Sequence, residues 1–460
     1  MFVCVGFMRC FKSLFLLAVF CLLNGALFGS WSYIERASLN QASQGFLGQL
    51  GVDGFGRALL VWREGENKII GNTFSNFVWS KPKTLFTDAN GIRHVSVSKS
   101  LCGDKTFLNY VTEKNQLKAA VLEDGSWSSS EMLLSNISDP LHCLAVTVDG
   151  TAMSLGVVSG GSVWSTFFEG TSWEQAKFVG KCMQSDWVFS DQSISVGEYP
   201  LRQKKIYAVW PSDTGFDFGV FDEETKKWSI ESNDASVLPQ STSVVANGLG
   251  QVFLTWFDKD NHCMYGRYFD GENWFDDVIA SDLDCDVQCF DIGMDESGVA
   301  YVIVSTCEDA AFGKIVAFVR DLDSNWTKTQ LDKCARLKSS SGSALAVHPN
   351  GTALVVWAAK PREVSNYCHL YYAEYTPKFG WSRKVRFVDF SIDSSFVVSM
   401  PQVAVSRNGA AVVVWHDLED HGDQHVLAMI DSEFTTPATP VPPQRLTGTK
   451  FKNRQLLLNK

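Results

Sequence analysis

The stretch SVVANGLGQVFLTWFDKDNHCMYGRYFDGENW, residues 243–274, contains a complete pattern of strands and turns. Short runs rich in Val, Phe, Thr and Tyr cover residues 243–246, 251–256 and 264–269, and a fourth run begins at Trp274. Gly, Asn and Asp fill the intervals. Because β-branched and aromatic residues favour strands while Gly, Asn and Asp favour turns, the stretch predicts four antiparallel strands in one small sheet.

The same unit recurs along the chain at intervals of about 50 residues, which is typical of a repeat architecture. Its second strand reappears in five clear copies and in two weaker ones, which end at Tyr110 and Trp210. The clear copies are Gly56–Trp62, Gly150–Gly156, Gly298–Val304, Gly351–Trp357 and Gly409–Trp415. A tryptophan before the fourth strand recurs as Trp79, Trp127, Trp173, Trp228, Trp274, Trp326 and Trp381.

Repeated four-stranded sheets of this length predict an all-β fold, an eight-bladed β-propeller over residues 31–431. The last unit has no tryptophan in its fourth position, whereas Trp31 lies one repeat before Trp79. We therefore expect residues 31–40 to supply the outer strand of the last blade, so that the N-terminal strand closes the ring. Seven blades are the alternative. The recurring tryptophans are expected to pack between blades and not to bind a ligand.

The first 29 residues are typical of a signal peptide. Arg9 and Lys12 precede an apolar run from Leu14 to Leu23, and small residues follow near Gly29. That run is too short for a comfortable membrane span, and no later segment could cross a bilayer as a helix. The segment predicts export to the periplasm, the outer envelope or the secreted space, with no integral membrane span once it is removed.

Net charge narrows the class of expected binding partners, and cysteine spacing narrows the expected bonds between cysteines. With 51 acidic against 40 basic residues the formal net charge is −11, so nucleic acid is not an expected partner. Of the 12 cysteines, Cys4, Cys10 and Cys21 lie in the signal peptide, and the others are scattered without a Cys-x-x-Cys pair. Buried small hydrophobic residues are the simplest interpretation of most of them, and disulfide pairing is the alternative.

Loop lengths predict which face carries a site. The turns between first and second strands are short and rich in Gly, whereas the loops after the second strands and between blades vary and carry charge. Variable loops on a rigid scaffold are the usual place for binding. The candidate ligand-binding residues are loop carboxylates and two tryptophans outside the repeat: Glu64, Glu66, Asp258, Asp260, Asp417, Asp423, Trp164 and Trp187.

The segment 416–425 is the richest of these loops. His416, His421 and His425 alternate there with carboxylates, a set of ligands able to bind zinc or a similar ion. A solvated loop and a pH-sensitive contact are the alternatives, because a hairpin loop lacks the helical spacing that would align the imidazoles. No cofactor motif was found, and no cofactor is expected.

The residues favour a protein- or glycan-binding or scaffolding module over an enzyme. The arginine triad and Asp boxes of sialidases are absent, as are a nucleophile elbow, a His-Glu-x-x-His motif and a P-loop. The alternative is a glycan-active hydrolase or lyase that uses two loop carboxylates, since loops can bring any two together.

The pattern Gly-x-Ala-x-Val-Val-Trp, as in Gly351–Trp357, resembles the repeats of bacterial exported β-propellers, including large envelope-associated proteins of chlamydia-like bacteria. The resemblance covers the propeller region and implies architecture more than activity. After it, residues 432–443 form a Pro- and Thr-rich linker, and residues 444–460 form a basic tail. Pro442–Thr447 resembles the opening strand of a fibronectin type III domain, and a disordered tail is the alternative.

Overall fold

A computed structural model of the chain describes residues 35–36, 49–53, 55–75, 78–99, 105–147, 150–182, 194–198, 204–234, 241–258, 260–281, 283, 286–309, 312–335, 342–359, 369–386, 399–418, 424–431 and 434. All its regular elements in these residues are β-strands, and they form eight separate antiparallel sheets. The described part of the chain contains no helix that is long and apolar enough to cross a membrane. The signal peptide, Trp31, the linker apart from Phe434, and the basic tail lie outside the described residues.

We number the sheets 1 to 8 along the chain. Sheets 1 to 3 each have a divided outer strand, whereas sheet 4 has four continuous strands. Sheet 1 contains β2 (Gln49–Val52), β3 (Ala58–Glu64), β4 (Lys68–Ser75), β5 (Val78–Trp79) and β6 (Lys83–Thr87). Sheet 2 contains β7 (His94–Lys99), β8 (Lys105–Val111), β9 (Gln116–Glu123), β10 (Ser126–Trp127) and β11 (Glu131–Ser135). Sheet 3 contains β12 (Ile137–Val146), β13 (Ala152–Val158), β14 (Ser162–Glu169), β15 (Ser172–Trp173) and β16 (Lys177–Lys181). Sheet 4 contains β17 (Ile194–Glu198), β18 (Lys204–Ser212), β19 (Gly215–Asp222) and β20 (Lys227–Asp234).

The second half of the chain repeats the arrangement. Sheet 5 contains β21 (Ser241–Ala246), β22 (Val252–Asp258), β23 (Cys263–Phe269) and β24 (Trp274–Ala280). Sheet 6 contains β25 (Asp286–Met294), β26 (Ala300–Asp309), β27 (Phe312–Arg320) and β28 (Trp326–Ala335). Sheet 7 contains β29 (Ser343–Val347), β30 (Ala353–Ala359), β31 (His369–Thr376), β32 (Gly380–Trp381) and β33 (Val385–Arg386). Sheet 8 contains β34 (Ser399–Val405), β35 (Ala411–Leu418), β36 (Gln424–Asp431) and, from the start of the chain, β1 (Glu35–Arg36).

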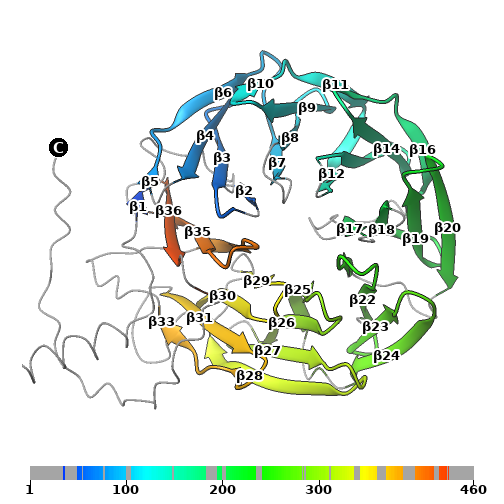
Figure 1. Cartoon of the computed structure of the whole chain (residues 1–460), viewed down its shortest axis with the longest axis vertical. Helices are drawn as coiled ribbons and strands as arrows, with labels where there is room; N and C mark the ends of the chain where they lie inside the picture. The colour runs from blue at the N-terminus through cyan, green and yellow to red at the C-terminus, as the bar shows by residue number, and fades with distance from the viewer. Residues whose placement is uncertain are drawn as a thin grey trace, which may run out of the picture.

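The sheets stand around a centre with their first strands innermost (Figure 1). The first strand of each sheet contacts that of the next sheet, and β34 of sheet 8 contacts β2 of sheet 1. β1 pairs antiparallel with β36, with Glu35 opposite Ala428 and Arg36 opposite Leu427. The radial arrangement of four-stranded sheets confirms the prediction of an all-β propeller fold.

The hydrophobic core lies between sheets. Each neighbouring pair of sheets shares a cluster of buried apolar side chains, and Val412 and Val414 of sheet 8 join the cluster of sheet 1. The second strand of each sheet is therefore covered by a neighbouring sheet on both sides. This explains why β30 is buried along its whole length and why such strands are apolar without alternation.

The recurring tryptophans pack as expected. The ring of Trp127 in sheet 2 lies 5.3 Å from that of Phe86 in sheet 1, and Trp173 in sheet 3 lies 6.1 Å from Phe107 in sheet 2. Edge-to-face and tilted pairs at this separation add to the free energy of burying the rings. The interpretation of these tryptophans as packing residues between blades is thus confirmed for the described pairs.

The sequence predicts a single outer strand in every sheet. In sheets 1, 2, 3 and 7 the structure instead divides the outer strand in two. In three of these sheets a serine follows the tryptophan. Ser80 shows the cause: its backbone N–H donates to the carbonyl of Thr73, while its Oγ accepts from the Thr73 N–H at 3.1 Å. Ser128 and Ser382 make the same pair of contacts. The hydroxyl replaces a backbone partner, so the chain leaves the strand at this point.

The short turns after the first strands share one geometry. In sheet 1 the backbone N–H of Asp53 donates to the carbonyl of Arg57, and that of Gly56 donates to the carbonyl of Asp53. The Asp53 carboxylate accepts from the N–H groups of Phe55 and Arg57. Gly56 has φ +81°, a left-handed conformation that a side chain would strain. These turns lie at the same end of the ring as the turns before the outer strands. We call this end the uniform-turn face.

Candidate functional site

The opposite end of the ring, which we call the variable-loop face, carries the loops after the second strands and the connections between sheets. Backbone hydrogen bonds join the two sets. The Ile92 N–H donates to the Glu66 carbonyl at 2.7 Å, and the Leu283 N–H donates to the His262 carbonyl at 3.1 Å. Because these described connections are bonded to the loop of the sheet before them, the two sets lie on one face. This confirms that the variable loops share a face, whereas a ligand site on that face stays a prediction.

The structure places the candidate carboxylates on this face but does not gather them. Glu64 and Glu66 belong to sheet 1, whereas Asp258 and Asp260 belong to sheet 5, on the other side of the ring (Figure 1). Trp164 lies on β14 of sheet 3. These described residues therefore do not converge on one small pocket.

The remaining candidates can be placed only in part. Trp187, His421 and Asp423 lie outside the described residues, as do the side chains of His416, Asp417 and His425. The register of β35 and β36 puts the backbone of Asp417 opposite that of His425, and His416 opposite Val426. Among the described residues no group of three or more His, Cys, Asp or Glu is arranged to hold a metal ion. The metal site at these histidines stays a prediction.

Asp258 has a structural role in its loop. Its side chain is 4% exposed, and its Oδ1 accepts from the backbone N–H groups of Asp260 and Asn261, both at 3.1 Å. Its Oδ2 accepts from the Asn261 side chain at 2.7 Å. A short polar side chain that satisfies the backbone of its own loop fixes the loop conformation. Asp260 is exposed and remains available to a ligand.

Trp164 is half-buried and packs beside the outer strand of its own sheet. Its ring lies 5.9 Å from that of Phe178 on β16, edge to face. The Phe178 side chain is 54% exposed. The pair forms an aromatic surface on sheet 3, and Trp164 also packs against the buried cluster that Val111, Leu117 and Leu134 of sheet 2 share with Ile137 of sheet 3.

Two buried carboxylates connect neighbouring sheets, and no sequence pattern marks them. Asp88, after β6 of sheet 1, accepts from the Tyr110 hydroxyl at 3.1 Å and from the Lys118 ammonium at 2.6 Å, both in sheet 2. Burial by itself raises the pKa of Asp88, but the Lys118 ammonium, the Asn90 N–H and the Tyr110 hydroxyl together hold it below its usual value. Burial and the Asp88 charge raise the pKa of Tyr110 to about 12.

Asp332 repeats this arrangement between sheets 6 and 7. Its side chain is 3% exposed and accepts from the indole Nε1 of Trp357 at 3.1 Å and from the Lys384 ammonium. Trp357 and Tyr110 occupy equivalent places in their second strands, as do Trp62, Trp210 and Trp415. The carboxylates thus satisfy buried donors of the next sheet, which identifies them as structural residues.

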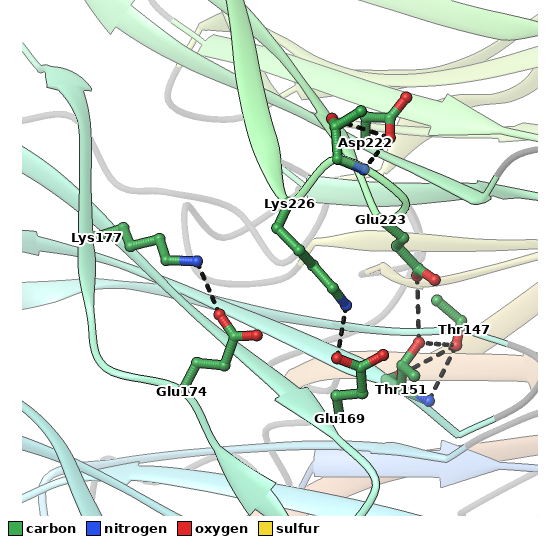
Figure 2. Close-up of polar contacts among 9 residues, drawn as sticks. Thr147, Thr151, Glu169, Glu174, Lys177, Asp222, Glu223 and Lys226 are labelled. Atoms are coloured by element: carbon green, nitrogen blue, oxygen red, sulfur yellow. Dashed lines mark hydrogen bonds and ion pairs between the residues drawn. The ribbon is translucent and has the colours of Figure 1, made fainter.

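Polar contacts also join sheets 3 and 4 at the uniform-turn face (Figure 2). The Lys226 ammonium pairs with Glu169 at 2.7 Å, and the Thr151 hydroxyl donates to Glu223 at 3.2 Å. Beside them Asp222 accepts from the backbone N–H and the hydroxyl of Thr225. These hydrogen bonds hold the pKa of Asp222 below its usual value. The turn between β19 and β20 is therefore held both to its own carboxylate and to sheet 3.

A pocket of about 170 Å³ lies between sheets 4 and 5. It is lined by Lys205, Tyr207, Phe218, Val220, Ser229, Ile230, Glu231, Phe269 and Trp274. Sequence reasoning missed it, because Trp274 belongs to the repeat and was assigned to packing alone. The sequence carries no signal of it, because four residues separate Phe269 from Trp274 in sheet 5, as four separate Phe168 from Trp173 in sheet 3.

Comparisons with known proteins assign no activity to the chain. No protein-family model matches the chain, and no curated protein matches its sequence. A fucose-recognising lectin of Aleuria aurantia, described as a six-bladed β-propeller, is 11% identical, with 67% of this chain and 98% of the lectin covered and a TM-score of 0.38. The SapL1 lectin in complex with α-methyl fucoside is 13% identical, with 62% and 91% covered and a TM-score of 0.37. A prolyl endopeptidase is 11% identical, with 85% and 55% covered and a TM-score of 0.46. Similarity at this level leaves the function to be argued from the residues of this chain.

Proposed function

We propose that this chain is an exported, closed eight-bladed β-propeller that binds a protein or glycan ligand through its variable-loop face. The observation that carries the proposal is the division of the ring into two unlike ends. At one end, uniform turns repeat a single hydrogen-bonded geometry. At the other end, loops of different length and charge are fastened to the connections between sheets, as in the bond from Ile92 to Glu66.

The variable-loop face is preorganised. Arg63 donates from its guanidinium to the Ile92 carbonyl at 2.7 Å, and the Asp88 N–H donates to the Asn67 carbonyl at 2.9 Å. Loops fixed in this way lose little conformational entropy when a ligand binds, which favours binding by a surface of separate contacts. The exposed carboxylates Glu66 and Asp260 would select ligands that offer cations or hydrogen-bond donors.

The test compares carboxylates on the two faces. Labelled mature protein is applied to a glycan array and to a panel of envelope and extracellular proteins. Glu66→Ala and Asp260→Ala change exposed carboxylates on the variable-loop face, whereas Glu272→Ala and Asp323→Ala make the same change in exposed turns of the uniform-turn face. We expect binding to weaken at least fivefold only in the first pair. Equal effects in both pairs would contradict the proposal.

The alternative, a hydrolase or lyase that uses loop carboxylates, is tested with the same variants. Pooled glycoside and polysaccharide substrates are incubated with the mature protein. Turnover that disappears in Glu66→Ala or Asp260→Ala would replace the binding proposal with an enzymatic one. Absence of turnover together with retained glycan or protein binding would support the binding module.

Closure of the ring has its own test. The pairing of β1 with β36 supports the assignment of residues 31–40 to the last blade. Deleting residues 31–40 should leave the outer edge of β36 unpaired, lower the melting temperature and promote association between chains. Deletion of residues 444–460 serves as the control. An unchanged melting curve in the first variant would count against closure.

Export rests on the predicted signal peptide at residues 1–29. Expression of the full chain in a bacterial host with a fractionated envelope would locate the product. N-terminal sequencing should find cleavage close to Gly29. An uncleaved chain retained in the cytoplasm would contradict export, whether to the periplasm, the outer envelope or the medium.

A further inference from the structure

The pocket between sheets 4 and 5 lies away from the variable loops. Phe269 ends β23 and Trp274 begins β24, on either side of the turn that joins them, and Lys205 lies near the start of β18. All three positions are at the end of the sheets that carries the uniform turns. A ligand in this pocket is therefore independent of the variable-loop face.

The equivalent space between sheets 2 and 3 is closed by a lysine. Lys105 and Lys205 occupy the same place in β8 and β18, opposite Glu123 and Asp222 respectively. The Lys105 ammonium lies 5.2 Å from the centre of the Phe168 ring, donates to the Gly170 carbonyl at 2.6 Å and pairs with Glu123 at 3.3 Å. Three contacts thus hold this lysine across the gap.

The contacts that hold the Lys105 ammonium have no equivalent at Lys205. Asp222 is one methylene shorter than glutamate, and its carboxylate accepts from Thr225 instead. The turn at Gly170 corresponds in sheet 5 to the turn 270–273, in which Asp270 accepts from the backbone N–H groups of Glu272 and Asn273. Lys205 makes no hydrogen bond or ion pair with the described residues. Its charge therefore lines an open space.

The walls of the pocket are mainly aromatic. Phe218 lies 5.1 Å from Trp274, edge to face, and 6.0 Å from Tyr207. Val220 and Phe269 complete the apolar lining. Such a surface favours an apolar ring, since burying one releases water from both partners.

The second charged group of the lining is already neutralised. Glu231 pairs with Arg267 at 3.1 Å, and the same guanidinium pairs with Asp276 at 3.0 Å and lies 5.2 Å from the centre of the Trp274 ring. Lys205 attracts the Asp222 carboxylate but makes no hydrogen bond or ion pair with the described residues. An anionic group of the ligand would supply such a direct contact.

From this geometry we propose that the pocket binds a small aromatic carboxylate, with the ring against the wall formed by Trp274, Phe218 and Tyr207 and the carboxylate at the Lys205 ammonium. A volume of about 170 Å³ equals that of roughly six water molecules, enough for a single ring with a short acidic arm. It lies below the range of about 300–1,000 Å³ typical of pockets for larger ligands.

The test is a ligand-observed NMR titration of the mature protein with four probes. Phenylacetate has both the ring and the charge, phenylacetamide lacks the charge, cyclohexylacetate lacks the aromatic ring, and glucuronate lacks the apolar surface. We expect saturable binding of phenylacetate, at least tenfold tighter than that of phenylacetamide, weaker binding of cyclohexylacetate and none of glucuronate. Added salt should weaken only the anionic probes.

Three variants locate the binding. Lys205→Met should reduce the preference for phenylacetate over phenylacetamide to within twofold, whereas Lys227→Met, the same change on the neighbouring outer strand, should leave it unchanged. Ser229→Trp places an indole at the exposed mouth and should abolish binding of all probes without altering the core. Circular dichroism and the melting temperature confirm that each variant is folded.

The proposal is overturned if phenylacetate does not saturate, if the amide binds equally well, or if Ser229→Trp leaves the titration unchanged. Glucuronate binding as tightly as phenylacetate would overturn the aromatic part of the assignment. Glu66→Ala and Asp260→Ala should not affect these titrations. A failure here therefore leaves the proposed function of the variable-loop face untouched, and the reverse also holds.

Discussion

Asn408, in the turn between β34 and β35, donates a hydrogen bond from its Nδ2 to the backbone carbonyl of Phe55 at 2.8 Å. The two residues are separated by 353 positions, yet they lie in adjacent turns of sheets 8 and 1. The Leu50 N–H donates to the Gln402 side chain at 3.0 Å between the same sheets. These bonds belong to a series at the uniform-turn face that includes the contact of His348 with the Arg407 carbonyl.

Asn408→Ala should destabilise the protein more than Asn350→Ala. Both side chains are exposed and both cap their own turn, since Asn350 Oδ1 accepts from the Thr352 N–H and Asn408 Oδ1 accepts from the Ala410 N–H. Asn408 alone of the two also has the bond to Phe55. We expect an extra loss of about 0.5–1.5 kcal/mol in urea unfolding. Equal losses would mean that the bond between the first and last sheets contributes nothing.

Asp332→Ala should cost about 2–3 kcal/mol of unfolding free energy, because it leaves the buried Trp357 indole N–H without its acceptor and the Lys384 ammonium without its partner. Asp332→Asn, which retains one acceptor oxygen, should cost less. Lys384→Met is the control for the ion pair alone and should cost about 1 kcal/mol or less, since Lys384 is 42% exposed. A loss in Lys384→Met as large as in Asp332→Ala would contradict this assignment.

The carboxylate of Asp88 makes stability depend on acid pH. Its pKa is lower in the folded protein than in the unfolded chain, where the ordinary value of 3.8 applies. The ionised carboxylate therefore contributes stability above pH 3.8, and this contribution is lost as the pH falls through the lowered pKa of the folded state. Urea unfolding of the wild type and Asp88→Asn at pH 7, 5 and 3 should show a difference that narrows at the lowest pH. A difference that widens there would contradict the direction of the shift.

The sequence predicted what recurs and missed what depends on neighbouring sheets. Glycines such as Gly351, the apolar second strands and the tryptophans repeat at a fixed interval, so local propensity and periodicity indicated the strands, the turns and the fold. Asp88 and Asp332 could not be recognised, because their partners lie on the next sheet and only packing brings them together. The same holds for the pocket at Lys205, because its lining comes from sheets 4 and 5, which only packing brings together.

The recurring tryptophans should contribute more to stability than a tryptophan outside the repeat. Trp173 packs between sheets against the rings of Phe107 and Phe168, whereas Trp164 lies against a smaller aliphatic cluster of sheets 2 and 3 and against Phe178, which is itself half-exposed. Both tryptophans are half-buried, so exposure alone does not distinguish them. Trp173→Ala opens a cavity between two sheets and should cost about 2–4 kcal/mol, while Trp164→Ala should cost about 1–2 kcal/mol. Urea unfolding of the two variants measures this, with Phe178→Ala as the control for the surface pair. If Trp164→Ala proves the more costly, the packing role belongs to the residue outside the repeat, and the repeated tryptophans would need another explanation.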